Sequence, residues 1–242
     1  MELQGKTVVV TGASSGIGAS LAAAFRDRGC RLVLIARSRE HLLTVAYPDD
    51  LVLDADLSIA AERKRVVETI VRERGPVHVL VNNAGAGLYG EVQTIPLAAA
   101  RALFEINFFA PMELCQLTVP HMPPGSMVVN ISSIGGKLIL PWATLYSATK
   151  YALDALSDGL RIELYPRGIR VMGVYPGHIH TEFQQHVIYG RAPGKLAPRR
   201  NPFTIAPQEC ARAIVRGVER EAKVLVVPAI YWFAVWGARV FP

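Results

Sequence analysis

The sequence is poor in cysteine, because its 242 residues include only Cys30, Cys115 and Cys210. Three widely separated cysteines provide neither a disulfide framework nor the ligand spacing of a zinc site. Reduced thiols are typical of cytoplasmic proteins, since disulfides persist mainly in oxidising compartments. No signal-peptide pattern precedes the first apolar run, which follows Lys6. We therefore expect a cytoplasmic protein.

Blocks of like charge are absent as well. The formal net charge of +6 is compatible with nucleic acid, an anionic membrane surface or a phosphorylated cofactor. Because the charged residues are scattered along the chain, no nucleic-acid-binding stripe is expected. A hydrophobic content of 51% excludes a disordered, solvating chain. The length suits one domain with a sizeable core.

The apolar C-terminal tail, residues 228–242, is too short to cross a membrane. Its ten uncharged residues, 229–238, are followed by Arg239, whereas a spanning helix needs about 20 residues. The tail can pack on the body of the protein or on a second subunit, as apolar stretches of soluble proteins usually do. Alternatively, it lies on a membrane surface with Trp232 and Trp236 at headgroup level. We expect packing, with peripheral membrane contact as the alternative.

Short apolar runs alternate with amphipathic segments along the whole chain. This alternation predicts a parallel sheet with helices on both faces, that is, a doubly wound α/β fold of about seven strands. Right-handed crossovers then place the carboxyl ends of all strands at one edge, where ligands bind. The predicted strands are 7–11, 31–36, 51–53, 77–82, 126–132, 169–175 and 223–227, and the predicted helices are 17–28, 38–46, 59–74, 97–120, 146–165 and 207–221. We see no internal repeat or linker, so residues 1–242 are expected to form a single domain.

One connection, residues 178–206, is long for a compact domain. It is rich in proline and basic, with Arg191, Lys195 and Arg199 among its residues. Loops of this length usually form a lid or a binding loop. We expect this segment to be the substrate loop.

A glycine-rich turn, Thr11–Gly18, lies between the first predicted strand and the first predicted helix. Gly12, Gly16 and Gly18 allow the backbone to turn tightly and to approach a pyrophosphate at the N-terminus of that helix. The Gly-x-x-x-Gly-x-Gly spacing differs from the Gly-x-Gly-x-x-Gly of larger dinucleotide-binding domains. The alternative interpretation is an ordinary strand-to-helix turn.

A tyrosine and a lysine four residues apart, Tyr146 and Lys150, share one face of a predicted helix. A nearby ammonium favours the phenolate, because it lowers the pKa of an acid. Such a tyrosine can exchange protons with an alcohol or a carbonyl near neutral pH. A pair with this spacing alone is more often a stripe on a helix surface, so its interpretation depends on the surrounding motifs.

The order of the motifs along the chain identifies a family resemblance. In sequence order they are Thr11–Gly18, Asn82–Gly85 after an apolar run, Asn107 in a helical segment, Ser132 and Ser133 after another run, Tyr146–Lys150, and Pro176–Gly177. In this order the sequence resembles the classical short-chain dehydrogenase/reductase (SDR) family, over nearly all of residues 5–182. The resemblance implies a Rossmann-like fold and an oxidoreductase that acts on CH–OH donors with NAD(P).

The resemblance assigns catalytic roles to Ser133, Tyr146, Lys150 and Asn107. It makes Tyr146 the general acid in reduction and the general base in oxidation, with Lys150 lowering its pKa and holding the nicotinamide ribose. Ser133, chosen over Ser132 because it precedes Tyr146 by 13 residues, would donate to the substrate oxygen. Asn107 would bind a water that links Lys150 to solvent, although a buried amide can simply satisfy a neighbouring carbonyl.

The resemblance also implies a cofactor site. Asp56 would meet the adenine amino group, unless it or Ser58 caps the next helix. Asn82 is as well explained as a structural brace, and His178 and His180 as loop residues rather than metal ligands. The residues assigned to the cofactor are Gly12, Ser14, Ser15, Gly16, Ile17, Gly18, Arg37, Asp56, Leu57, Asn83, Ala84, Gly85, Tyr146, Lys150, Pro176, Gly177, Ile179 and Thr181.

The second predicted strand ends without an acid. An acidic residue there would bind the adenine ribose hydroxyls and select NAD. Arg37 occupies this place instead, and a guanidinium is well suited to a 2′-phosphate. The sequence therefore favours NADP(H) over NAD(H), the alternative being that Arg37 is an ordinary surface arginine.

We expect an enzyme that interconverts a ketone or aldehyde and an alcohol on a lipophilic small molecule. The alternatives are a catalytically silent nucleotide-binding scaffold or a non-redox reaction on the same fold. The complete set of Ser133, Tyr146 and Lys150 argues against a silent scaffold. By resemblance, a homodimer or homotetramer is expected. The residues expected to line an apolar substrate pocket are Leu88, Tyr89, Leu138, Ile139, Leu140, Trp142 and Phe183.

Overall fold

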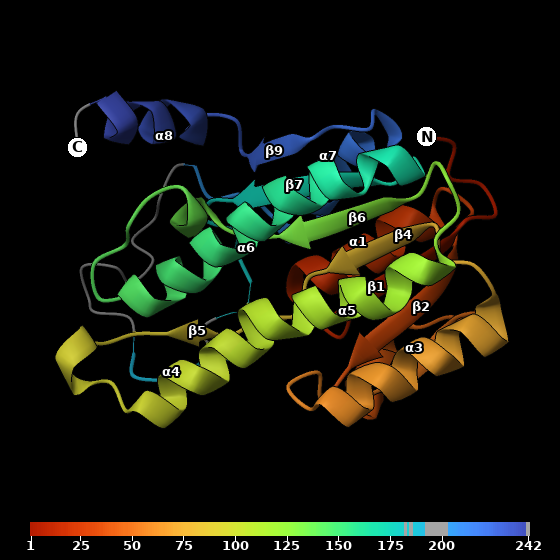
Figure 1. Cartoon of the computed structure of the whole chain (residues 1–242), viewed down its shortest axis with the longest axis horizontal. Coiled ribbons are helices and arrows are strands. Elements are labelled where there is room, and N and C mark those ends of the chain that lie inside the picture. The colour runs from red at the N-terminus through yellow and green to blue at the C-terminus, as the bar shows by residue number, and fades with distance from the viewer. Residues whose placement is uncertain (182, 184–185, 192–202, 241–242) are drawn as a thin grey trace.

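A seven-stranded parallel sheet forms the centre of the molecule (Figure 1). The computed structural model describes residues 1–181, 183, 186–191 and 203–240. All neighbouring strands of this sheet are parallel, which confirms the predicted doubly wound fold. In order across the sheet, the strands are β3 (Leu51–Asp54), β2 (Arg31–Ala36), β1 (Thr7–Thr11), β4 (Val79–Asn82), β6 (Met127–Ile131), β7 (Arg170–Pro176) and β9 (Val224–Val227).

The side chains of the strands form two hydrophobic cores, one on each face of the sheet. In β1, Val8 and Val10 belong to one core and Val9 to the other, because successive side chains of a strand point to opposite faces. Helices cover both faces, which explains the almost uninterrupted apolar strand sequences. The first core is closed by α1 (Gly16–Arg26) and α7 (Pro207–Glu219), and the second by α3 (Ala60–Arg74), α5 (Ala110–Thr118) and α6 (Thr144–Glu163), which lie in front of the sheet in Figure 1.

The order of the strands reverses between β1 and β4. From β1 the chain proceeds through β2 to β3 on one side, and from β4 through β6 and β7 to β9 on the other. Such a switch point is where open α/β sheets bind ligands.

Shorter helical segments connect the strands and helices. They are α2 (Arg39–Val45) and the single turns η1 (Val92–Thr94), η4 (Ile134–Gly136) and η5 (Tyr165–Arg167).

The helix predicted over residues 97–120 is not a single regular helix. It consists of α4 (Leu97–Phe104), the π-helical turn η2 (Glu105–Phe109), α5 and the 3₁₀ turn η3 (Val119–His121). In η2 the Ala110 N–H bonds to the Glu105 carbonyl, five residues back. Pro111 gives a physical reason, because it has no N–H and its ring would clash with the carbonyl of Asn107 in a regular α-helix.

A small second sheet was not predicted. It pairs β5 (Gly87–Leu88) with β8 (Val187–Tyr189), which belongs to the long connection 178–206. An isolated bridge between Ile179 and Ile205 joins the two ends of that connection. The expected substrate loop is therefore anchored at both ends, although residues 182, 184–185 and 192–202 lie outside the described part of the chain.

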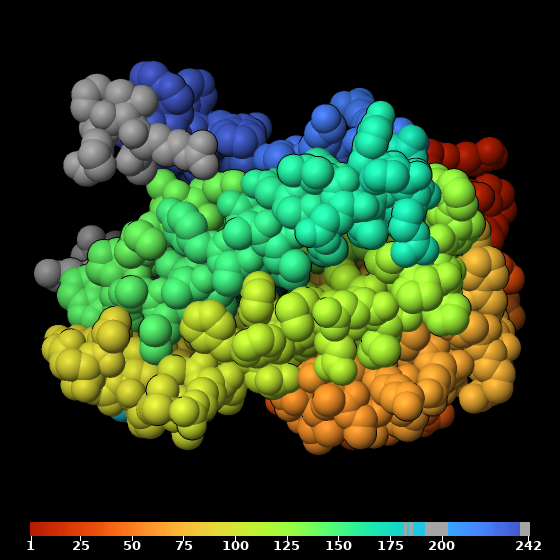
Figure 2. Space-filling view, viewed as in Figure 1, coloured from red at the N-terminus to blue at the C-terminus, as the bar shows by residue number. Residues whose placement is uncertain are grey.

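The apolar tail forms a helix, α8 (Tyr231–Val240), at one end of the molecule (Figures 1 and 2). Val235 is buried with Tyr175 and Val226, and Tyr231 packs against the same cluster. In the structure the tail therefore packs on the body of the protein. Trp232, Phe233 and Trp236 are exposed. Among the described residues, no helix has the length and apolar character needed to span a membrane.

Candidate functional site

The glycine-rich turn after β1 is closed by direct backbone contacts. A Cβ at Gly18 would lie 2.0 Å from the Gly12 carbonyl oxygen, and a Cβ at Gly12 would lie 2.9 Å from the Cα of Ala84. Gly12 also has a φ of +63°, which favours glycine. The turn thus packs against the segment after β4, and only glycine fits at these two positions.

Thr11 joins the two segments. The backbone N–H groups of Asn83 and Ala84 both donate to its Oγ1 at 2.9 Å, and the Asn83 side chain donates to the Thr11 carbonyl oxygen at 2.8 Å. The structure therefore brings Asn83, Ala84 and Gly85 beside the glycine turn. This role of Thr11 was not predicted; its signal in the sequence is a hydroxyl at the last position of β1, directly after three valines.

We expect Gly18→Ala to destabilise the fold by about 1–3 kcal/mol, as overpacking does, and to weaken dinucleotide binding. The new Cβ would collide with the Gly12 carbonyl, so the turn would have to shift. Gly237→Ala is the matched control, because a Cβ added to this helical glycine would have nothing within 4 Å. Urea unfolding and calorimetric titration would measure both effects. Equal stability of the two variants would contradict the expectation.

The N-terminus of α1 is suited to an anion. Ser15 is the N-cap residue, yet its side chain makes no capping bond, and the first turn contains no acidic residue. The helix dipole and the first backbone N–H groups therefore favour a negative ligand. The side chain of Thr181, from the loop after β7, approaches the turn and would lie 3.3 Å from a Cβ at Gly16. Thr181 can thus reach a ligand held by the turn.

Arg37 and Asp56 follow the carboxyl ends of β2 and β3, and the charge of Arg37 acts on Asp56. Partial burial acts to raise the pKa of Asp56, but hydrogen bonds from Ser58 and the positive charge of Arg37 outweigh it and lower that pKa. Neither Asp56 nor Ser58 is the helix cap, because the N-cap of α3 is Ile59. Arg37 is exposed, and Arg39 forms an ion pair with Asp54 at 3.3 Å.

The loop that contains Leu57 is held in place by hydrogen bonding to a buried arginine. The Leu57 carbonyl oxygen accepts a 2.7 Å hydrogen bond from the buried side chain of Arg63, which also forms ion pairs with Glu105 and Glu113. Arg63 therefore links the expected adenine loop to the π-helical turn. This link was not predicted, since an arginine in an amphipathic helix is usually exposed.

Tyr146, Lys150 and Ser133 come together at the carboxyl end of β6. Tyr146 and Lys150 are one turn apart on α6, and the Lys150 Nζ lies 5.8 Å from the centre of the Tyr146 ring. Ser133 lies close enough to Tyr146 for its hydroxyl to lower the pKa of that tyrosine, and both side chains lie beside Gly135. Ser132 instead donates to the Lys150 carbonyl oxygen at 3.2 Å. This geometry favours Ser133 over Ser132 as the partner of Tyr146.

Burial dominates the pKa values of Tyr146 and Lys150. It raises the pKa of Tyr146 to about 12, although the neighbouring Ser133 hydroxyl acts to lower it. Burial also lowers the pKa of Lys150 to about 8. Burial is the largest influence on both groups, and the expected lowering of the Tyr146 pKa by Lys150 stays a prediction. The Lys150 ammonium donates to the Ile131 carbonyl oxygen at 3.0 Å.

These two pKa values predict a pH dependence of stability. Lys150 has an ordinary pKa of 10.5 and a folded value of about 8, so the unfolded chain binds more protons between these pH values and stability rises there with pH. Lys150→Met lacks this titrating group. The free energy of unfolding of Lys150→Met minus that of the wild type should therefore fall by on the order of 1–3 kcal/mol as the pH rises from about 8 to 10.5. Urea unfolding at a series of pH values would measure it.

Tyr146 provides a check of opposite sign. Its folded pKa is raised from 10.0 to about 12, so its contribution to stability is present below pH 10 and is lost as the pH rises towards 12. The stability of Tyr146→Phe relative to the wild type should therefore rise over that range. If the difference in unfolding free energy between variant and wild type stays constant with pH for both Lys150→Met and Tyr146→Phe, the burial of Lys150 and Tyr146 is contradicted.

Asn107 is fully buried in the π-helical turn. Its side chain accepts from the Ala86 N–H at 2.9 Å, and donates to the Ala86 carbonyl at 3.0 Å and to the Thr149 hydroxyl at 3.1 Å. The side chain therefore satisfies neighbouring groups, which is the alternative that the sequence left open. It also holds Gly85 near Lys150, since a Cβ at Gly85 would lie 3.0 Å from the Asn107 Oδ1 and 3.6 Å from the Lys150 Nζ.

Apolar rings surround Tyr146. The ring of Phe183 meets it edge-on with centroids 5.8 Å apart, and Tyr89 lies close enough for its charge to act on the pKa of Tyr146. Phe183 lies beside the small sheet, since a Cβ at Gly87 would lie 3.3 Å from the Phe183 ring and 3.4 Å from the Val187 side chain. Of the other expected pocket residues, Leu140 and Tyr146 both contact Gly135. Leu88 is fully buried, and the partly buried Leu138 packs against the tail cluster; that they line the pocket stays a prediction.

Two further expectations concern groups beside the site. The Asn82 side chain donates to Asn130 at 2.9 Å, and Asn130 donates to Ser157 at 2.9 Å; Asn82 is therefore a brace between β4, β6 and α6. His178 lies against the Tyr231 ring, with centroids 6.4 Å apart. Within the described residues, no group of three side chains is arranged to ligate a metal ion.

Comparisons with known proteins agree with this geometry. A family model described as short chain dehydrogenase matches residues 6–191. A dehydrogenase/reductase SDR family protein 7-like of Anopheles gambiae is 31% identical over 250 residues, covering 95% of this chain and 78% of that protein. A 3-ketodihydrosphingosine reductase of Bacteroides thetaiotaomicron is 33% identical over 183 residues, covering 75% of this chain and 66% of that protein.

Solved structures are also similar. A short-chain dehydrogenase from Sphingobium yanoikuyae, in complex with NADPH, is 31% identical, with a TM-score of 0.80. The match covers 97% of this chain and 94% of that chain. The likeness therefore extends over the whole sheet and the helices on both of its faces.

Proposed function

This chain belongs to the short-chain dehydrogenase/reductase family, and we propose that it is an NADP(H)-dependent enzyme that interconverts a ketone or an aldehyde and an alcohol on a lipophilic small molecule. The family makes it an oxidoreductase that acts on CH–OH donors with NAD(P). The proposal rests above all on the meeting of Ser133, Tyr146 and Lys150 at the sheet edge that also carries the glycine turn.

The cofactor would supply the hydride for reduction when it is bound. The residues fit such a group: Gly12 and Gly18 leave no side chain over the turn, the α1 N-terminus favours the pyrophosphate, and Arg37 provides a cation for a 2′-phosphate. The high pKa of Tyr146, caused by burial, keeps its hydroxyl protonated as a donor. This protonated state suits the general acid of carbonyl reduction.

Tyr146 would donate its proton to the carbonyl oxygen, and Ser133 would donate a hydrogen bond to the same oxygen as negative charge develops there. Lys150, whose pKa is lowered to about 8 by burial, is still a cation at neutral pH. Its charge then stabilises the phenolate that remains after proton transfer. In alcohol oxidation the same groups act in reverse.

A route for the returning proton follows from Asn107. Its side chain is occupied by Ala86 and Thr149, so a bound water would be held by its backbone carbonyl. Pro111, four residues later, has no N–H to donate to that carbonyl in a regular helix. We therefore assign to the Asn107 carbonyl the water that would pass protons from solvent to Lys150.

The substrate class follows from the wall around Tyr146. Phe183, Tyr89 and Leu140 present apolar surface near its ring, and burial raises the pKa of Tyr89, which indicates a dry environment. The likeness to a 3-ketodihydrosphingosine reductase supports a ketone with a long hydrocarbon portion. A lipophilic ketone would bury its apolar part here while its oxygen reaches Tyr146.

The test is a substrate screen on the purified protein, following the absorbance of NADPH. The panel would contain long-chain ketones, steroid ketones, aldehydes and short polar ketones of matched reactivity. We expect turnover with lipophilic carbonyls and weak turnover with the polar ones. Tight NADPH binding without turnover of any carbonyl would indicate the silent scaffold instead, and consumption of a substrate without a change in NADPH would indicate a non-redox reaction.

We propose that α8 closes the nicotinamide side of the site. Tyr231 contacts Gly177 so closely that a Cβ there would lie 2.1 Å from its ring, and Phe203 from the end of the long connection faces the same ring. Deleting residues 229–242 is expected to change the substrate affinity or the oligomeric state, a homodimer or homotetramer, and to leave cofactor binding unchanged. Light scattering and steady-state kinetics would measure these effects.

The exposed tryptophans of α8 make membrane binding the competing outcome of that experiment. If assembly and kinetics stay unchanged and binding to anionic liposomes disappears, Trp232, Phe233 and Trp236 lie on a membrane surface. A cytoplasmic location, expected from the three free cysteines, stays part of the proposal.

A further inference from the structure

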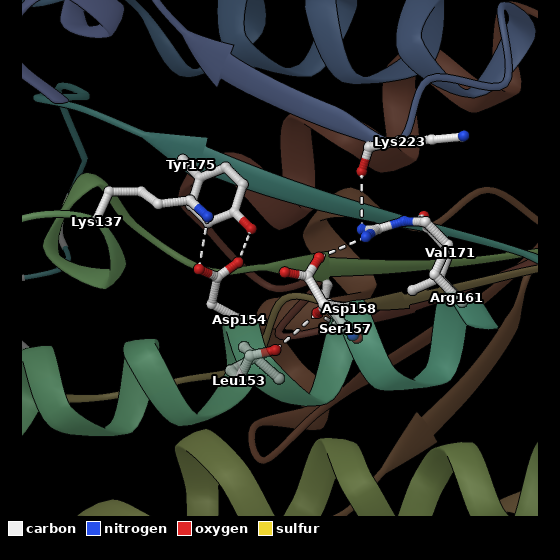
Figure 3. A network of polar contacts seen from close by, with 10 residues as sticks. Lys137, Leu153, Asp154, Ser157, Asp158, Arg161, Val171, Tyr175 and Lys223 are labelled. Carbon is white, nitrogen blue, oxygen red and sulfur yellow. Dashed lines mark hydrogen bonds and ion pairs between the residues drawn. The ribbon is translucent and has the colours of Figure 1, made fainter. Parts of the chain in front are cut away.

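Three ionisable side chains outside the site form a compact network (Figure 3). The Lys137 ammonium pairs with one carboxylate oxygen of Asp154 at 2.5 Å, and the Tyr175 hydroxyl donates to the other. The ammonium also lies 4.3 Å from the centre of the Tyr175 ring. Each member therefore contacts the other two. Tyr175 is fully buried, and the side chains of Lys137 and Asp154 are only 11% and 13% exposed.

The network is balanced in charge. Lys137 carries a positive and Asp154 a negative charge, while burial, followed by the effects of Asp154, raises the pKa of Tyr175 and keeps its hydroxyl a donor. Asp158 also raises the pKa of Tyr175 and Arg161 lowers it, and these two pair with each other one turn further along α6. A buried pair of this kind is weak evidence for stability, so a role in geometry is the question to test.

The three residues belong to the three elements that carry the site. Lys137 follows Ser133 by four residues, across the single turn η4, in which Gly135 donates to the Ser133 Oγ at 3.0 Å. Asp154 is one helical turn beyond Lys150 on α6. Tyr175 directly precedes Pro176 at the end of β7, where the loop that approaches the glycine turn begins. A shift of one member would therefore move a neighbouring site residue.

We propose that Lys137, Asp154 and Tyr175 are positioning residues that fix the Ser133 turn, the Tyr146/Lys150 helix and the start of the loop after β7 relative to one another. This inference rests on the proposed function of the Ser133, Tyr146 and Lys150 site. The three residues touch neither substrate nor cofactor in it. They act by setting the distance between the Ser133 and Tyr146 hydroxyls, and a misplacement of about 1 Å can reduce a rate on the order of 100-fold.

The test compares Lys137→Met and Tyr175→Phe with a matched control, Arg161→Met. Arg161 also ties α6 to the sheet, through the carbonyls of Val171 and Lys223 (Figure 3). It lies in the last turn of α6, whereas Tyr146 lies in the first. We expect both network variants to lower kcat for the best carbonyl of the screen by about 10- to 100-fold. The KM for NADPH should change by less than about threefold, and Arg161→Met should change kcat by less than about threefold, whatever its effect on stability.

Two further readouts separate positioning from a general loss of structure. Lys137→Arg, which keeps the charge, should recover most of the kcat that Lys137→Met loses. The double variant Lys137→Met/Tyr175→Phe should lose less than the product of the single losses, since both act through Asp154. Three results would overturn the proposal. They are a double variant whose loss of kcat equals the product of the single losses, a Lys137→Arg variant with a kcat as low as that of Lys137→Met, and an equal loss of kcat in Arg161→Met. If Lys137→Met does not fold, Tyr175→Phe and Lys137→Arg still decide it.

Hydrogen exchange makes the test independent of turnover. Amides of residues 133–140 should exchange faster in Lys137→Met and Tyr175→Phe than in the wild type, and at the wild-type rate in Arg161→Met. If the amides of residues 133–140 exchange at the wild-type rate in both Lys137→Met and Tyr175→Phe, the proposed positioning role is wrong. If the wild type reduces no carbonyl, the proposed function fails, and the exchange result alone then decides whether the network fixes these elements.

Discussion

Replacing Tyr146 by phenylalanine is expected to lower kcat by about 10²–10⁴-fold, the range found when a positioned acid or base is removed. Phenylalanine keeps the ring that meets Phe183 edge-on and removes only the hydroxyl, whose pKa the neighbouring Ser133 acts to lower. Folding and NADPH affinity should therefore stay close to those of the wild type. Steady-state kinetics with the best carbonyl substrate, together with NADPH titration, would measure the two effects separately.

Tyr151→Phe is the control for this experiment. Tyr151 lies on the same helix five residues later, and it is 39% exposed. The same loss of a hydroxyl there should leave kcat unchanged. A kcat for Tyr146→Phe within about threefold of the wild type would remove Tyr146 from its proposed role as acid and base.

Arg37→Asp is expected to reverse the preference between NADP(H) and NAD(H). A charge-assisted contact to the 2′-phosphate contributes about 1.5–3 kcal/mol, or roughly 10–150-fold in affinity. Arg37 is exposed at the end of β2, and its charge helps to lower the pKa of Asp56. An aspartate in its place would repel the phosphate and could accept hydrogen bonds from ribose hydroxyls. Calorimetric titration of both cofactors would measure the change.

Arg39→Ala serves as the matched control for Arg37, since its guanidinium is already paired with Asp54. We expect this variant to change the ratio of the two cofactor affinities far less than Arg37→Asp. If the wild type binds NADP(H) and NAD(H) equally well, Arg37 points into solvent and the proposed preference is wrong. If Arg39→Ala has the larger effect, Arg39 holds the phosphate.

The seven strands of the sheet could be predicted from the sequence because each is a short apolar run between turn residues. Their observed boundaries differ from the predicted ones by at most two residues, as at β4, which begins at Val79 rather than at residue 77. The small sheet could not be predicted. Gly87 and Leu88 are too few to show a pattern, and their partner β8 is almost 100 residues away.

The site could be predicted in outline but not in its electrostatics. Spacing alone placed Tyr146 and Lys150 on one face of a helix, and the structure agrees. The pKa of Tyr146 could not be predicted, because it depends on how deeply the folded chain buries this side chain. The network of Lys137, Asp154 and Tyr175 could not be predicted either. Its members come from different elements, so no helical or strand periodicity in the sequence indicates that they are in contact.

The π-helical turn η2 limits how this sequence can diverge. Each residue of a regular helix advances the next by about 100°, so the extra residue in the turn sets the angle between α4 and α5. Losing one residue between Glu105 and Phe109 would rotate these two halves against each other and withdraw Asn107 from Ala86. Substitutions at exposed Phe109 leave that angle unchanged. We therefore expect this segment to keep its length, together with Asn107, and to vary only at exposed positions such as Phe109.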